Sequence, residues 1–145
     1  MKLVKKLLML EDRRGFTLIE LLVVMIILGL LAALVGPKLI GNVDKAKIKA
    51  AKAQIELLSQ GLDQFRLDVG RFPSTAEGLQ ALVANPGVED WEGPYLKKPT
   101  VPKDSWNKEY AYKSPGTHGD YDISSYGADG QEGGSKENQD INSWE

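Results

Sequence analysis

The feature that most constrains this chain is an uncharged apolar segment near its amino terminus. The sequence has no charged residue from Leu21 to Pro37, and the apolar stretch Phe16–Gly36 is 21 residues long. As a helix this stretch would measure about 31 Å, at about 1.5 Å per residue. That length matches the roughly 30 Å hydrocarbon core of a bilayer. The segment is therefore long enough to span a membrane.

Three interpretations of this segment compete. A cleaved secretory signal has a shorter apolar run and a cleavage site of small residues, a pattern that residues 32–36 fit poorly. A buried helix in a protein of 145 residues would not be apolar on every side. A membrane anchor fits the length. Residues 1–15 also carry five basic side chains against two acidic ones, which favours a cytoplasmic amino terminus.

Glu20 is an acidic side chain within the apolar segment. A carboxylate at membrane depth is costly unless it has a partner. Glu20 either reaches water at the membrane interface or pairs with a cation. A cut between Gly15 and Phe16 would create such a cation, because the new α-amino group would lie four residues before Glu20.

A helical pattern with one apolar face follows Pro37. Its apolar residues recur at spacings of three and four and predict a continuous helix packed against a core. They are Ile48, Ala51, Ile55, Leu58, Leu62, Phe65 and Val69. Gly70 fits the left-handed residue that commonly follows a helix. The lysines of residues 45–52 lie mostly off this face. They are either solvated, or they contact acidic lipid or an acidic patch of a neighbouring subunit.

The remaining residues predict a small α+β region. Ser74 and Glu77 have the spacing of a capping box, which predicts that a short helix opens there. Aromatic and apolar residues alternate over 110–112 and 121–123, with the Pro-Gly turn 114–119 between them. This pattern predicts an antiparallel hairpin or small sheet that packs on the apolar helix face.

The carboxyl-terminal residues are strongly acidic. Residues 120–145 hold seven acidic side chains and one lysine, although the whole chain has a formal net charge of only −2. Residues 127–139 contain several glycines and almost no large apolar group, and the chain has no cysteine to staple them. Two outcomes remain. The segment is a disordered acidic tail, or its oxygens fold around a hard cation such as Ca²⁺.

Composition excludes several functions. The chain has no cysteine and one histidine, which excludes disulfides, a thiol nucleophile and a zinc site with several histidines. We find no phosphate-binding loop, no paired catalytic carboxylates and no basic stripe for nucleic acid. His118 is expected to be structural or solvated, and Asp120 and Asp122 to face solvent or a neighbour. We therefore predict that the protein is not an enzyme.

Several segments resemble a known family. Residues 14–20, Arg-Gly-Phe-Thr-Leu-Ile-Glu, follow a short charged leader and resemble the processing motif of type IV pilins and type II secretion pseudopilins. Residues 114–123, 126–134 and 140–144 resemble the carboxyl-terminal half of the major pseudopilins of type II secretion. One departure lies at residues 104–107, Asp-Ser-Trp-Asn, where that family often has Asp-Pro-Trp-Gly. Asparagine tolerates the left-handed conformation that glycine would supply.

The resemblance implies a type IV pilin-like α+β fold in four parts. Residues 1–15 would be a cleaved prepilin leader and 16–37 a helix that spans the membrane and later forms the filament core. Residues 38–70 would continue this helix, and 71–145 would form a periplasmic head with an acidic carboxyl-terminal loop. The protein would be anchored in the bacterial inner membrane, with its amino terminus in the cytoplasm, before it joins a periplasmic filament.

The resemblance also implies residues for processing and assembly. A prepilin peptidase would cut between Gly15 and Phe16 and then N-methylate Phe16. Glu20 would pair with the Phe16 amine of an adjacent subunit and align the subunits during assembly. Pro37 matches the family's helix-breaking proline, which removes a backbone donor and bends or loosens the helix.

In this family the acidic loop binds a structural Ca²⁺ ion. Carried over to this sequence, Asp129 and Asp140 would be the side-chain ligands. The other oxygen donors would be the carbonyls of Tyr126 and Gln131, with Asn138 or Gln139 adding one more.

The function implied is that of the major structural subunit of the type II secretion pseudopilus, a periplasmic helical filament that helps drive folded proteins across the outer membrane. Its partners would be further copies of itself, the prepilin peptidase, minor pseudopilins, the inner-membrane secretion platform and, before assembly, the lipid bilayer. The alternative is a type IV pilin or a minor pseudopilin, although many type IV pilins carry a cysteine pair that this chain lacks. A membrane-tethered calcium-binding enzyme and a secreted domain behind an ordinary signal peptide are more distant alternatives.

Overall fold

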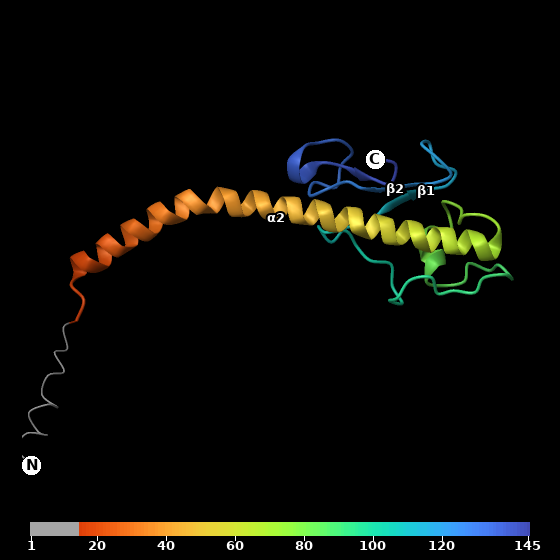
Figure 1. Cartoon of the computed structure of the whole chain (residues 1–145), viewed down its shortest axis with the longest axis horizontal. Helices are drawn as coiled ribbons and strands as arrows, with labels where there is room; N and C mark the ends of the chain where they lie inside the picture. Colours follow the sequence, from red (N-terminus) through yellow and green to blue (C-terminus); the bar gives the residue numbers. More distant parts are fainter. Residues whose placement is uncertain (1–14) are drawn as a thin grey trace, which may run out of the picture. The chain divides into compact units, whose positions relative to one another are not determined.

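The computed structural model describes residues 15–145 (Figure 1). Within them lie one long helix, two 3₁₀ helices and three short strands. Their bounds are α2 Leu18–Val69, η1 Leu79–Leu82, β1 Ala111–Lys113, β2 Asp122–Ser125, η2 Lys136–Asn138 and β3 Ile141–Asn142. The chain divides into two compact units, with the boundary between Ile40 and Gly41. The predicted leader 1–15 lies outside the described residues, apart from Gly15.

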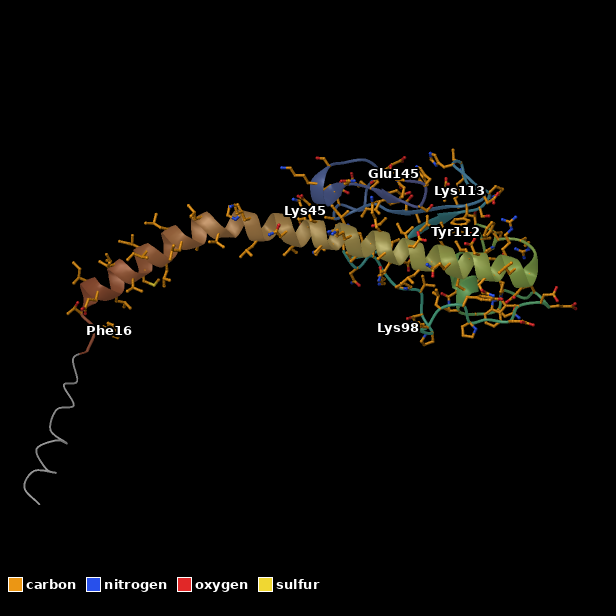
Figure 2. The ribbon with its side chains drawn as sticks, viewed as in Figure 1. Phe16, Lys45, Lys98, Tyr112, Lys113 and Glu145 are labelled. Carbon is orange, nitrogen blue, oxygen red and sulfur yellow. The ribbon has the colours of Figure 1, made fainter. Side chains whose placement is uncertain are left out.

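The first unit consists mainly of the apolar part of α2, which is long and apolar enough to cross a membrane. Its large apolar side chains are exposed, among them Met25 at 65% and Leu31 at 54%. Figure 2 shows side chains projecting to both sides of this part of the ribbon. Water-soluble monomers rarely expose a continuous apolar surface of this extent. Pro37 lies inside α2, which continues on both sides of it.

The second unit has a core built on the predicted apolar face of α2. Ala51, Ile55, Leu58, Leu62 and Phe65 are buried, with Ile48 and Val69 packed beside them. Leu79, Leu82, Tyr110, Ile123 and Ile141 complete the core from the other elements. The helix also ends as predicted, because Gly70 has a φ of 86° and donates its N–H to the Arg66 carbonyl at 2.8 Å.

The predicted hairpin is present and has a third strand beside it. β1 and β2 are antiparallel with Tyr112 opposite Ile123, and β2 pairs with β3 through Ser125 opposite Ile141. The strand order is β1-β2-β3, and Figure 1 shows β1 and β2 along the second half of α2. β3 was not predicted, because a strand of two residues leaves no alternation in the sequence.

The predicted short helix is present but begins later than expected. Ser74 and Glu77 do form the reciprocal bonds of a capping box, at 2.7 Å from Ser74 N to Glu77 Oε2 and 3.2 Å from Glu77 N to Ser74 Oγ. Gly78 follows with a left-handed φ of 64°. The box therefore closes a turn, and the short helix η1, a 3₁₀ helix, begins only after it, whereas the sequence predicted that the helix opens at the box.

The turn that departs from the family pattern keeps its left-handed residue. Asn107 has a φ of 62°. The buried carboxylate of Asp104 accepts hydrogen bonds from Trp106 N at 3.0 Å and Lys108 N at 2.8 Å. Asparagine thus takes the glycine conformation expected of it, and Asp104 holds the turn together without the proline.

Candidate assembly and metal sites

Thr17 and Glu20 lie at the start of α2, next to the predicted processing point. Oε2 of Glu20 accepts hydrogen bonds from Thr17 N at 2.8 Å and Thr17 Oγ1 at 3.0 Å. In return, Glu20 N donates to Thr17 Oγ1 at 3.2 Å. These bonds form a capping box with Thr17 as N-cap. Phe16 precedes it and is 88% exposed (labelled in Figure 2).

The role of Thr17 was missed in the sequence, although its signal was present. Thr17 and Glu20 have the same spacing as Ser74 and Glu77, the capping box that was predicted. A carboxylate in the first turn is also favoured by the positive end of the helix dipole. Glu20 therefore starts the helix of its own chain, and its Oε1 has no hydrogen-bond partner among residues 15–145.

The side of α2 that faces away from the core in the second unit is exposed and carries a strip of uncharged residues, with charged residues such as Lys49 along one edge. At about 100° per residue the strip lies roughly 110–180° from the buried face. Its members are Ala46, Ala50, Ala53, Leu57, Gln60, Gln64 and Leu67, and we call them the uncharged outer face. Leu57 is 59% exposed and Leu67 77%. A surface helix of a soluble monomer normally carries its charges on this side.

The basic cluster predicted within residues 45–52 flanks this face. Lys45 (labelled in Figure 2), Lys49 and Lys52 are exposed. Lys47 is half-buried, and its carbonyl accepts a hydrogen bond from Ser105 Oγ at 2.7 Å. Three lysines are thus available for contact with acidic groups outside this chain.

Asp129 and Asp140 direct their carboxylates toward the backbone of the acidic loop, here residues 127–140. Asp129 Oδ1 accepts a hydrogen bond from Gln131 N at 3.1 Å, and Asp140 Oδ2 accepts one from Gly133 N at 2.8 Å. Asp140 Oδ1 is buried and has no hydrogen-bond partner within residues 15–145. Since a buried carboxylate oxygen without a partner is costly, this atom fits a cation site.

The backbone of the acidic loop folds back on itself. Ala128 N donates to the Glu137 carbonyl at 2.8 Å. Gly127 has a φ of 69°, and a Cβ there would lie 2.8 Å from the carbonyl oxygens of both Glu137 and Gln139. Only glycine allows this close crossing, which brings several carbonyl oxygens of residues 137–139 to one end of the loop.

The structure brings some of the predicted ligands together. Tyr126 and Asp140 line the same open groove, of about 800 Å³. Gln131 meets Asp129 through its backbone N–H. In the described part of the chain, no three acidic, histidine or cysteine side chains converge. A cation here would rely largely on carbonyl oxygens, a donor set that Ca²⁺ accepts.

Comparison with known proteins identifies the family. Residues 38–144 match the model described as type II secretion system (T2SS), protein G, and residues 12–36 match the prokaryotic N-terminal methylation motif. The chain belongs to the protein G family of type II secretion systems.

Relatives in the protein G family cover almost the whole chain. Type II secretion system core protein G of Pseudomonas aeruginosa is 47% identical over 140 residues, which are 93% of this chain and 97% of that protein. The Vibrio cholerae protein of the same name is 44% identical over 92% of this chain and 93% of its own. The crystal structure of the major pseudopilin of enterohaemorrhagic Escherichia coli matches with a TM-score of 0.61 and 36% identity, covering 74% of this chain and 95% of that one. The predicted family and pilin-like α+β fold are confirmed, and the family is one of structural subunits.

One expectation for this protein G family member was wrong. Asp122 is only 8% exposed and does not face solvent. Its carboxylate accepts hydrogen bonds from Thr117 N at 2.8 Å and His118 N at 3.2 Å, and lies 3.1 Å from His118 Nδ1. Burial opposes its ionisation, but these bonds lower the pKa of Asp122 overall. The His118 ring stacks on Trp144 at 3.8 Å, so His118 joins the turn to the carboxyl-terminal residues.

Proposed function

We propose that this chain is the major pseudopilin subunit of a type II secretion system, and that it polymerises into a periplasmic helical filament that helps drive folded proteins across the outer membrane. The observation that carries this proposal is the exposed apolar helix of the first unit, which needs a bilayer or neighbouring helices to cover it. The methylation motif over residues 12–36 and the family match over 38–144 support the same assignment.

Processing would come before assembly. A prepilin peptidase cuts between Gly15 and Phe16 and methylates the new Phe16 amine. The excess of basic residues in 1–15 keeps this end in the cytoplasm, so the second unit lies in the periplasm. Gly15 precedes the helix, and among residues 15–145 nothing lies within 4 Å of a Cβ built on it. The bond to be cut lies ahead of α2, between two exposed residues.

Assembly would transfer the apolar helix from lipid to a core of neighbouring helices. In that core the Glu20 carboxylate of one subunit pairs with the Phe16 ammonium of the next, because either ion alone would be costly there. Oε1 of Glu20 makes no hydrogen bond among residues 15–145, which leaves it for such a contact. The uncharged outer face belongs to the same helix, α2, and we assign it to contacts between subunits. Minor pseudopilins and the inner-membrane platform would engage the same filament.

We also propose a structural Ca²⁺ ion in the acidic loop. Asp129 and Asp140 would hold it through their carboxylates. The remaining oxygens would come from the carbonyls of Tyr126 and Gln131 and from Asn138 or Gln139. When bound, the ion offsets the negative charge of the loop and cross-links its backbone. Oδ1 of Asp140 supports this assignment, because it is buried and has no hydrogen-bond partner within residues 15–145.

Filament formation tests the proposed function. The chain is expressed with a complete type II secretion machinery, and filaments released from the periplasm by opening the outer membrane are quantified by immunoblot and electron microscopy. We expect filaments from the wild-type chain, and their absence would contradict the proposal. Long surface fibres formed without secretion of folded proteins would favour a type IV pilin instead.

A matched pair of variants tests the uncharged outer face. Leu57→Asp places a carboxylate within it and is expected to reduce filament yield about tenfold or more, because an unpaired buried charge is costly. Ala84→Asp places the same charge at an exposed site near η1 and is the control. Equal yields from the two variants would show that the outer face makes no subunit contact.

A further inference from the structure

Lys108 is a lysine whose ammonium group lies against the acidic loop. Its Nζ donates a hydrogen bond to the Ala128 carbonyl at 2.5 Å. A Cβ built on Gly130 would lie 3.0 Å from the same Nζ and 3.2 Å from Cδ of Lys108. The aliphatic part of the side chain therefore runs along the backbone of Gly130, and Lys108 is half-buried.

The backbone of Lys108 is fixed by Asp104. Lys108 N donates to Asp104 Oδ1 at 2.8 Å, and the Lys108 carbonyl accepts from Asp104 N at 2.8 Å. The other oxygen of this buried carboxylate accepts a hydrogen bond from Ser125 Oγ at 2.7 Å, at the end of β2. Lys108 thus extends toward the acidic loop from a point that is bonded to the sheet.

The acidic loop has few other links to the rest of the protein. Its hydrogen bonds from Ala128 N, Gln131 N and Gly133 N all end on acceptors within residues 127–140. The Lys108 bond spans 20 residues and ties the loop to an earlier part of the chain. Lys136, inside the loop, is exposed, and its ammonium has no hydrogen-bond or ion-pair partner among residues 15–145.

We propose that Lys108 is a positioning residue of the acidic loop and holds the loop in its folded form when no divalent cation is bound. Its ammonium fixes the Ala128 carbonyl, next to Asp129, through a charge-assisted hydrogen bond. It also supplies positive charge to a segment in which acidic side chains outnumber lysine seven to one, over residues 120–145.

The proposal predicts a dependence on Ca²⁺, and in this part it rests on the proposed calcium site. With Ca²⁺ bound, the ion supplies both the positive charge and the cross-link. The contribution of Lys108 to the order of the loop is then small. Without the ion, Lys108 supplies the main electrostatic link between the loop and the sheet.

Limited proteolysis of the full-length chain in detergent tests this role. A glutamate-specific protease cuts after Glu132 and Glu137 once the loop opens, and mass spectrometry measures the rate at each site. In EGTA, Lys108→Met is expected to be cut about tenfold faster than the wild type, because loss of a charge-assisted bond raises the open population. In saturating Ca²⁺ the two rates are expected to agree within about twofold.

Two further variants separate the contact from general charge effects. Lys136→Met removes the same charge from the loop itself and is expected to match the wild type, whereas Lys108→Arg keeps the charge and is expected to restore protection. Hydrogen exchange of residues 51–65 checks that the core of Lys108→Met is intact. Equal cleavage of Lys108→Met and wild type in EGTA would overturn the proposal, as would equal acceleration by Lys136→Met. If Ca²⁺ does not protect the wild type, the calcium site is contradicted, and the comparison in EGTA still decides the role of Lys108.

Discussion

The backbone N–H of Thr17 donates a 2.8 Å hydrogen bond to the carboxylate of Glu20. The same carboxylate is proposed to meet the Phe16 ammonium of a neighbouring subunit. One side chain thus begins the helix within its own chain and leaves a second oxygen for a partner. The two roles use different properties of Glu20, since capping needs a hydrogen-bond acceptor and the ion pair needs a negative charge.

Substitutions at Glu20 are expected to separate these roles. Glu20→Ala should be processed normally but give about tenfold fewer filaments, because it leaves the Phe16 ammonium without a counter-charge in the filament core. Glu20→Gln keeps a hydrogen-bond acceptor for Thr17 but has no negative charge, so it should assemble as poorly as Glu20→Ala. Processing is followed by gel mobility, and assembly by the yield of filaments released from the periplasm. Thr17→Ser, which keeps the capping hydroxyl, is the control. Normal filament yield from Glu20→Ala would disprove the pairing.

The Arg71–Glu77 pair is expected to make stability depend on pH. Arg71 donates two hydrogen bonds to Glu77, at 2.7 Å and 2.8 Å, and it is the main cause of the fall in the pKa of Glu77 to about 2. Because the pKa is depressed in the folded state, the stabilisation is present above the unfolded value of about 4.3 and is lost as the pH falls toward 2.

Thermal unfolding of Glu77→Gln across this pH range measures the effect. An ion pair that is partly exposed contributes about 1 kcal/mol after solvent screening. The variant should therefore melt about 5 °C below the wild type at pH 7. The difference should narrow as the pH approaches 2. If the difference in melting temperature stays constant between pH 7 and pH 2, the charge of Glu77 does not contribute to stability.

Calcium removal is expected to destabilise the second unit. EGTA should lower the melting temperature of the detergent-solubilised chain by about 10 °C. A loss of this size is expected when the free Ca²⁺ concentration before EGTA is added lies well above the dissociation constant of the site. Asp129→Ala and Asp140→Ala should melt near the EGTA value with or without Ca²⁺. Asp120→Ala removes an exposed carboxylate and should respond to EGTA like the wild type. A wild-type melting temperature that EGTA leaves unchanged would exclude a structural ion.

The features predicted correctly from sequence are those with a local pattern. The spacing of the buried apolar residues predicted the second half of α2. Gly70 predicted where the helix ends, because a left-handed residue commonly follows the last turn of a helix. Alternation gave the β1–β2 hairpin. The left-handed φ of Asn107 agrees with the expectation that asparagine tolerates the conformation that glycine would supply.

The features that were missed or wrong depend on contacts between distant residues. The burial of Asp122 arises because the turn before β2 closes over its carboxylate, which alternation along the strand does not encode. The bond from Lys108 to Ala128 spans 20 residues and leaves no local signal. Asp129 and Asp140 were chosen through the family resemblance, whereas the approach of their loop's carbonyls depends on backbone conformations such as the left-handed Gly127.

The amino terminus of the mature protein tests the central claim most directly. The chain is expressed with a prepilin peptidase, purified from the membrane, and analysed by amino-terminal sequencing and intact mass. We predict a first residue of N-methyl-Phe16, followed by the rest of the chain to Glu145. A protein that begins after Ala33, or one that keeps residues 1–15, would contradict the assignment as a pseudopilin subunit.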